Sequence, residues 1–123
     1  VTGAQILFTP HLAPMNRGIL ATCYARPAVG TTPTTASLLA TLARAYAKEP
    51  LVVVGQNSPS TKATLGTNVT HITARYDERT GYVMVLSALD NLAKGASGGA
   101  VQAANVALGL NELDGLSMVG MYP

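Results

Sequence analysis

Two strand-like runs on either side of a short polar turn constrain the fold of this chain more than any other feature. The runs cover residues 69–76 and 82–89, and Asp77-Glu78-Arg79-Thr80-Gly81 separates them. Two β-prone runs joined by a short turn that ends in glycine predict a β-hairpin. The first run alternates in a mixed pattern that is compatible with one wetter face.

Two apolar runs precede the hairpin and read as strands. Residues 5–12 are apolar and β-prone but contain Pro10, and residues 18–25 carry no charge on either face. A run without a polar face is typical of a strand buried on both sides, so we expect that burial for residues 18–25. We expect Cys23, in the middle of this run, to be buried as well, since free cysteine is among the most buried residue types.

Helical spacing appears twice. Residues 31–50 place Leu38 and Leu42 on one stripe, with threonines available as N-caps and Pro50 beyond the end. Residues 91–109 read as a second helix. Residues 51–54 read as a short strand, residues 55–68 as a long surface loop, and the tail from 110 to 123 could add a final short strand.

These elements predict an α+β fold, with a mostly antiparallel or mixed sheet covered by a helix. The length of 123 residues is sufficient for one domain with a real core. Only 11% of the residues are charged, where about a quarter is usual, so much of the surface should meet something other than water.

Composition excludes several classes of function. A net charge of +2 without a cluster of Lys and Arg argues against nucleic-acid binding, and no apolar run reaches the length of a membrane span. One Cys and two scattered His do not make a metal site, so we expect none. A lone Cys and no visible signal peptide favour a reducing, cytoplasmic location.

Arg17 is a candidate binding residue because it lies in the Pro-to-Gly connection before residues 18–25. An arginine held by a rigid turn suits recognition of a carboxylate or a phosphate. The alternative is an arginine that caps a sheet edge or pairs with an acid. The sequence alone leaves both readings open.

The segment from Asp90 to Ala100 is unusual for the start of a helix. Lys94 opposes the helix dipole there, and Gly95 and Gly99 are poor helix formers. A segment with both features predicts close backbone approach or a nearby anion. Tight helix packing would explain the glycines without explaining Lys94, and no nucleotide-binding fingerprint is present.

Phe8 to Ile19 and Asp90 to Gly98 resemble the two signature stretches in the C-terminal part of the N-acetyl-γ-glutamyl-phosphate reductase family. Residues 46–50, 61–68 and 74–81 resemble the family at matching spacing, and residues 112–116 fit its end. The resemblance covers essentially the whole chain. It implies an enzyme of arginine biosynthesis that uses NADPH to reduce N-acetyl-γ-glutamyl phosphate to N-acetyl-glutamate semialdehyde, releasing phosphate.

In that family a Cys thiolate attacks the acyl phosphate, hydride reduces the thioester, and a His acts as acid and base. The family's Cys lies in a Pro-Gly-Cys-Tyr-Pro context and its His in a His-Arg-His context. Neither occurs here: Cys23 lies between Thr22 and Tyr24. No catalytic residue is therefore transferred, and the chain alone is expected to be inactive. A small hydrolase that uses Cys23 and a His is the weakest alternative.

The resemblance also implies binding residues. Asn91 matches the position beside the nicotinamide, and Lys94 and Gly95 belong to the same cofactor-facing turn. Arg17 matches a loop that faces the active site, where it would bind a substrate phosphate or carboxylate. His11 lies in the first signature stretch without a role that can be transferred.

The resemblance implies a division of the chain at residue 90. Residues 1–90 would be part of a substrate and dimerisation domain, and residues 91–123 a helix and tail that return to an N-terminal Rossmann cofactor domain absent from this chain. The expected partners are a small-molecule substrate, that cofactor domain, and further copies of the chain in a dimer or tetramer. The rival reading is a stand-alone oligomerisation or binding module without catalysis.

Overall fold

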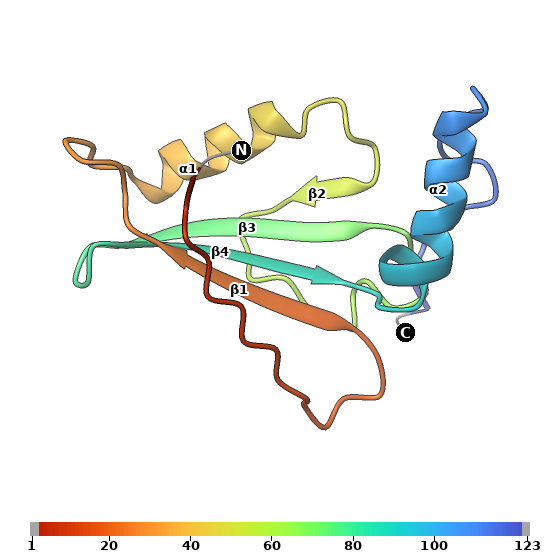
Figure 1. Ribbon diagram of the computed structural model, residues 1–123, viewed down its shortest axis with the longest axis horizontal. Helices are drawn as coiled ribbons and strands as arrows, with labels where there is room; N and C mark the ends of the chain where they lie inside the picture. Colours follow the sequence, from red (N-terminus) through yellow and green to blue (C-terminus); the bar gives the residue numbers. More distant parts are fainter. Residues whose placement is uncertain (1–2, 122–123) are drawn as a thin grey trace.

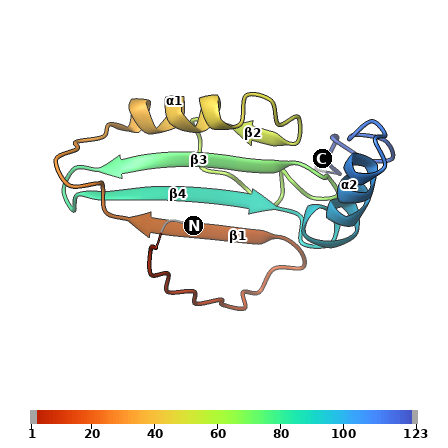
Figure 2. The ribbon, with the colours of Figure 1, turned by 45° about the horizontal axis from the view of Figure 1, so that its top comes forward.

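The computed structural model describes residues 3–121, which form a four-stranded sheet in the order β1-β4-β3-β2. β1 (Ile19–Ala25), β4 (Tyr82–Leu89) and β3 (Thr70–Asp77) are antiparallel neighbours. β2 (Val52–Val54) joins β3 in parallel and completes a mixed sheet, seen face-on in Figure 2. The expected α+β fold with a mixed sheet is confirmed.

The predicted hairpin is the centre of this sheet. The register aligns Asp77 with Tyr82, and the backbone N–H of Gly81 donates to the carbonyl of Asp77 at 2.8 Å. Gly81 has a φ of +70°, a backbone conformation that residues other than glycine rarely adopt. The glycine therefore explains where the chain reverses.

The first helix, α1 (Thr35–Ala45), begins where the threonines predicted it. Thr34 is its N-cap: its hydroxyl accepts the backbone N–H of Ser37, and the Ser37 hydroxyl accepts the N–H of Thr34. The hydroxyl oxygen of Thr35 also accepts the N–H of Tyr76 in β3 at 3.1 Å. In Figure 2, α1 lies alongside β3, next to β2, on the side of β3 that faces away from β4.

The second helix has two parts. A π-helical turn, η1 (Ala93–Ser97), leads into α2 (Gly98–Ala107), and Figure 1 shows both at one end of the sheet. The helix expected over residues 91–109 is therefore confirmed, with a wider first turn. At 11 and 10 residues, α1 and α2 are far shorter than a bilayer crossing needs, and no helix within residues 3–121 meets that requirement.

The expected final strand is wrong over residues 110–121, and the last two residues of the tail lie outside the described part. The tail instead returns to the loop before β3. The N–H of Asn68 donates to the carbonyl of Ser117, and the N–H of Met121 donates to the carbonyl of Leu65. These two hydrogen bonds use backbone groups that a strand would have used.

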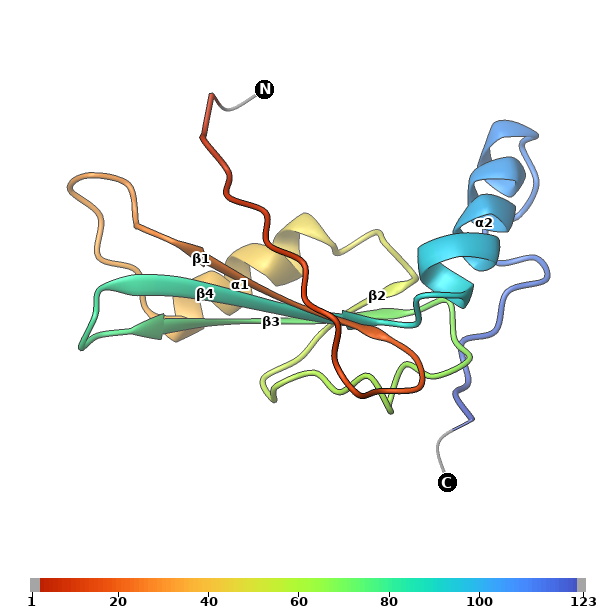
Figure 3. The same ribbon diagram turned by 60° about the horizontal axis from the view of Figure 1, so that its bottom comes forward.

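The strand expected over residues 5–12 is also wrong. This segment is irregular and runs away from the sheet, as Figure 3 shows. Its large apolar side chains are almost fully exposed: Ile6, Leu7, Phe8 and Leu12. A β-prone run forms a strand only where another strand accepts its hydrogen bonds, and none of the four strands of the described chain does so here.

The expectation that residues 18–25 are buried on both sides is wrong as well. Every residue of β1 is exposed, and Cys23 with them. β1 is an edge strand with β4 as its one neighbour, and α1 contacts β3 and β2. The absence of charge indicates a surface that something covers, but residues 3–121 do not supply that cover.

The core is correspondingly small. Among the described residues, the buried apolar side chains are Leu51, Val69, Ala74 and Ala88. The chain exposes 8651 Å² to solvent, whereas a compact monomer of its mass exposes about 6,200 Å². The length therefore did not predict the core correctly, because the elements spread in one layer and bury little against each other.

Candidate functional site

Asp90 lies at the end of β4 and is fully buried. Its carboxylate accepts the backbone N–H groups of Gly66 at 2.6 Å and of Leu92 and Ala93 at 2.8 Å. The Nε of Arg17 lies 2.9 Å from Oδ1 and 2.8 Å from Oδ2. The carboxylate therefore joins three segments that are distant in sequence.

The charge on Asp90 is stabilised by these donors. Burial raises the pKa of the carboxyl, but hydrogen bonds from Ala93, Gly66, Arg17 and Leu92 outweigh it and lower the pKa to about 2. Asp90 is therefore ionised at neutral pH, although no part of it reaches solvent.

A second hydrogen bond lies beside the first and joins the same two segments. The side-chain oxygen of Asn91 accepts the backbone N–H of Gly18 at 2.7 Å. Arg17 and Gly18 thus each donate to one residue of the pair Asp90-Asn91, and we call these four residues the clasp. Gly18 has a φ of +113°, and a Cβ there would lie 2.7 Å from the Cβ of Thr61, so the clasp needs glycine at this position.

Both readings of Arg17 meet in this arrangement. Arg17 pairs with an acid of its own chain, as the structural alternative expected. Its Nη atoms have no hydrogen-bond partner among residues 3–121, and its side chain is 29% exposed. The outward half of the guanidinium can therefore still bind an anion, and that role remains a prediction.

Lys94 has partners that the sequence did not reveal. Its Nζ donates to the side-chain oxygen of Gln102, and the amide nitrogen of Gln102 donates to Glu112 at 2.6 Å. Burial lowers the pKa of Lys94, while the charges of Glu112 and Glu49 oppose that shift without cancelling it. An internal polar network therefore balances this cation at the start of the helix, and its predicted cofactor contact is untested.

The glycines of this segment allow the π turn to pack closely. A Cβ on Gly98 would lie 2.2 Å from Oδ1 of Asn68 and 2.9 Å from the carbonyl of Ala93, and one on Gly99 would lie 2.6 Å from the carbonyl of Lys94. Close backbone approach thus explains Gly98 and Gly99. Gly95 differs, because a Cβ there would make ordinary contacts at 3.4 Å.

Two hollows of the described surface contain none of the predicted binding residues. One of about 180 Å³ lies under the loop before β3 and includes His71. The other, of about 250 Å³, lies between Asn68, Gly98 and Leu116. Arg17, Asn91, Lys94 and Gly95 instead lie on or beside the clasp. The candidate site therefore lies outside both of these hollows.

The other singled-out residues do not gather at the clasp. His11 is exposed on the N-terminal segment, and its Nδ1 lies 3.0 Å from the carbonyl of Thr9.

Cys23 and His71 lie on opposite faces of the sheet. Cys23 aligns with Val85, and His71 aligns with Ala88, which is three residues further along β4. This placement argues against a hydrolase built on Cys23 and His71, and residues 3–121 contain no cluster of three metal-ligating side chains.

Sequence reasoning missed Asp90 as the centre of the site. One signal was available: an acidic residue stands at the strand-to-helix junction, where its side chain can accept the N–H groups two and three residues later. Gln102 and Glu112 carried no comparable signal, because their roles depend on how the tail folds back onto α2.

Comparison with known proteins agrees with this picture. A family model for the dimerisation domain of semialdehyde dehydrogenases matches residues 2–91. N-acetyl-γ-glutamyl-phosphate reductases from Acidothermus cellulolyticus and Desulforudis audaxviator are 49% and 52% identical over 120 residues, which is 96% of this chain and 34% of each relative. The protein of that name from Micrococcus luteus is 50% identical over 121 residues, 97% of this chain and 34% of its own length.

The chain therefore spans about a third of the length of these curated relatives. The resemblance inferred from the two signature stretches is confirmed along almost the whole chain. Because the family model also matches well over half of the residues, the chain belongs to the semialdehyde dehydrogenase dimerisation-domain family.

Proposed function

We propose that this chain is the substrate and dimerisation part of an NADPH-dependent reductase of arginine biosynthesis. The complete enzyme would convert N-acetyl-γ-glutamyl phosphate to N-acetyl-glutamate semialdehyde in the cytoplasm. The observation that carries the proposal is 49–52% identity over at least 96% of the chain to proteins named for that activity. The large exposed surface supports it, because a part of a larger enzyme has surfaces that other parts cover.

The binding roles follow from the clasp. Arg17 would bind an anionic group of the substrate through its Nη atoms, which have no hydrogen-bond partner among residues 3–121. Asn91 would bind the cofactor, since its side-chain oxygen is used by Gly18 and its amide nitrogen has no partner among the described residues. Gly95, exposed on the same turn, and Lys94 would face the cofactor too. NADPH, when bound, supplies the hydride.

The chain alone would be inactive. These 123 residues contain neither of the sequence contexts that surround the catalytic Cys and His of the family. A second polypeptide segment would have to bring the nucleophile, the acid and base, and the Rossmann domain. The division at residue 90 belongs to this proposal: residues 1–90 would bind substrate and a second subunit, and residues 91–123 would return to the cofactor domain.

A hybrid enzyme tests the proposal. The chain is joined to the N-terminal two-thirds of the Acidothermus cellulolyticus reductase. The reaction is run in reverse with N-acetyl-glutamate semialdehyde, phosphate and NADP+, and the formation of NADPH is measured. We expect turnover from the hybrid and none from the chain or the N-terminal part alone. Turnover from the chain alone would overturn the claim that it is incomplete. A folded hybrid that binds NADPH without turnover would overturn the reductase assignment.

One observation favours a second candidate, a stand-alone oligomerisation module. β1 is exposed along its length and carries no charge, which suits an interface. Light scattering with and without the N-terminal part separates the two. Soluble, defined self-association of the chain alone would favour the module. Aggregation that the N-terminal part relieves would favour the reductase.

A further inference from the structure

We propose that Asp90 is a positioning residue that sets the substrate side and the cofactor side of the site relative to each other. This inference rests on the proposed function, since it concerns the roles of Arg17 and Asn91 in that reaction. It assigns the coupling of the two sides to one buried carboxylate that touches neither ligand.

Burial separates Asp90 from any ligand bound at the surface. Its side chain is fully inaccessible, so a substrate or cofactor on the surface cannot contact it. A buried carboxylate without partners would be strongly unfavourable, but this one accepts three backbone N–H groups and the Nε of Arg17. Its effect on a ligand must therefore act through the groups that it holds.

Asp90 holds groups on both sides of the candidate site. On one side it binds the Nε of Arg17, which leaves the two Nη atoms without a partner among residues 3–121. On the other side it accepts the N–H groups of Leu92 and Ala93, so the backbone that follows Asn91 is fixed. The hydrogen bond from Gly18 to Asn91 then closes the ring between the two sides.

Asp90 also holds a separate loop, the one before β3. The N–H of Gly66 donates to Oδ2 of Asp90 at 2.6 Å, and the same loop presents Thr61 against Gly18. Three chain segments thus converge on the carboxylate from different directions. Displacing the carboxylate would release the loop, the turn that carries Arg17 and the turn that carries Asn91 together.

The distinguishing test compares Asp90→Asn with Arg17→Met in the hybrid enzyme. Arg17→Met removes a substrate contact, so it should raise KM for phosphate and leave KM for NADP+ unchanged. Asp90→Asn should raise both KM values roughly tenfold, because it removes the charge-assisted bonds that orient both sides. Asp77→Asn, in the distant hairpin turn, is the matched control and should change neither.

The affinities for phosphate and NADPH can be measured without turnover, so they test the role of Asp90 independently of the enzyme's activity. Calorimetric titration with inorganic phosphate and with NADPH should show that Asp90→Asn weakens both, roughly tenfold each. In the double variant, Arg17→Met with Asp90→Asn, phosphate binding should be no weaker than in Arg17→Met alone, because the two residues act in one pathway. Independent, additive losses would overturn the inference.

The outcomes separate this inference from the proposed function. An active hybrid in which Asp90→Asn lowers thermal stability but leaves both KM values and both affinities unchanged would leave the reductase assignment intact and overturn the positioning role. A folded hybrid that binds NADPH without turnover would overturn the assignment, while the NADPH and phosphate titrations still decide the coupling. If Asp90→Asn does not fold, Asp90→Glu keeps the charge and should weaken both affinities in the same direction.

Discussion

Gly98 has no side chain, and this lets neighbouring atoms pack closely against its backbone. The π turn brings the carbonyl of Ala93 and the side chain of Asn68 against its Cα. We expect Gly98→Ala to lower the free energy of unfolding by about 1–3 kcal/mol, the usual cost of overpacking, as measured by urea unfolding. Gly55→Ala is the control, since nothing lies within 4 Å of a Cβ there, and equal losses in both variants would contradict the explanation.

The charge of Asp90 predicts a pH dependence of stability. Its pKa is about 2 in the folded chain and near 3.8 when unperturbed, so it stabilises the fold above pH 4. That contribution, about 2 kcal/mol, is lost as the pH falls from 4 towards 2, because the unfolded state takes up the proton first. Urea unfolding from pH 6 to pH 2 should show this loss in the native chain and not in Asp90→Asn.

Glu78→Gln is the control for this pH dependence, since it removes an exposed carboxyl in the hairpin turn. It should follow the profile of the native chain. If Asp90→Asn followed that profile as well, the acid sensitivity would have another source.

At the scale of elements, the two helices begin in different ways. α1 has a complete capping box between Thr34 and Ser37, and its first turn is a regular one. The π turn that precedes α2 has no side-chain cap from its N-cap residue Leu92; instead, the carboxylate of Asp90 accepts the N–H groups of Leu92 and Ala93. Both helical segments are therefore started by side chains nearby in sequence, but the carboxylate of Asp90 is itself held by the distant Arg17.

The cap of α1 gives a direct prediction. Thr34→Ala removes the acceptor for the N–H of Ser37 and should cost about 1 kcal/mol of stability, measured as a shift in the urea midpoint. Thr32→Ala, an exposed threonine just before the helix, should shift the midpoint by less than about 0.5 kcal/mol. A loss in Thr32→Ala as large as in Thr34→Ala would show that the cap is not the cause.

The helices and the hairpin were predictable because their signals are local. Threonine at the N-cap, glycine at the turn and helical spacing act within a few residues. The errors all concern segments whose state depends on a distant partner. Residues 5–12 have strand composition without a strand to pair with, and residues 18–25 have core composition at an exposed edge. An apolar composition shows that burial of a segment would be favourable. Whether the segment is buried depends on whether the tertiary structure places a partner against it.

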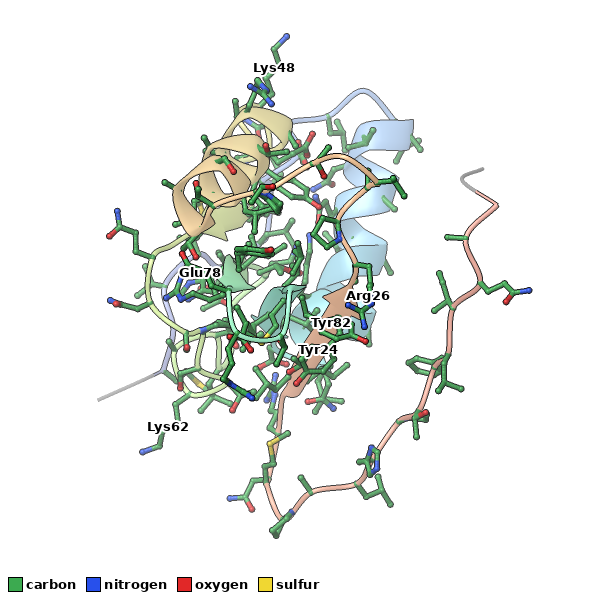
Figure 4. All side chains as sticks on the ribbon, turned by 90° about the vertical axis from the view of Figure 1, so that its left-hand side faces the viewer. Tyr24, Arg26, Lys48, Lys62, Glu78 and Tyr82 are labelled. Atoms are coloured by element: carbon green, nitrogen blue, oxygen red, sulfur yellow. The ribbon has the colours of Figure 1, made fainter. Side chains whose placement is uncertain are left out.

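At the scale of the whole molecule, the sheet has open surface that a folded domain usually covers. Figure 4 shows the N-terminal segment standing apart from the body, while Arg26 lies over the ring of Tyr82 at the end of the sheet, 4.3 Å from its centroid. The chain belongs to a dimerisation-domain family, so we expect self-association to supply part of the missing cover.

The alkylation rate of Cys23 can show whether β1 is covered, since Cys23 is the one cysteine of the chain and lies in the middle of β1. Iodoacetamide should label it rapidly in the isolated chain, as followed by intact mass. In the assembled hybrid we expect labelling to be clearly slower, because a thiol in an interface is protected. Both proteins should react equally in urea, and equal rates without urea would show that β1 stays exposed in the assembly.

The candidate site divides in the same way. Arg17, Asn91, Lys94 and Gly95 could be proposed from their motifs alone. Asp90 could not be assigned its role from spacing, because 73 positions separate it from Arg17 and only the antiparallel pairing of β1 with β4 brings them together. The partners of Lys94 likewise depend on the tail folding back to Glu112.

The sequence by itself determined the family, the hairpin and the two helices, and it singled out the candidate binding residues, because each of these is encoded in short stretches of neighbouring residues. Only the tertiary structure decided that β1 is an exposed edge, that the core is small, and that Asp90 joins the two halves of the site. These features depend on contacts between distant segments, whose free energy comes from burial and pairing that no local pattern specifies.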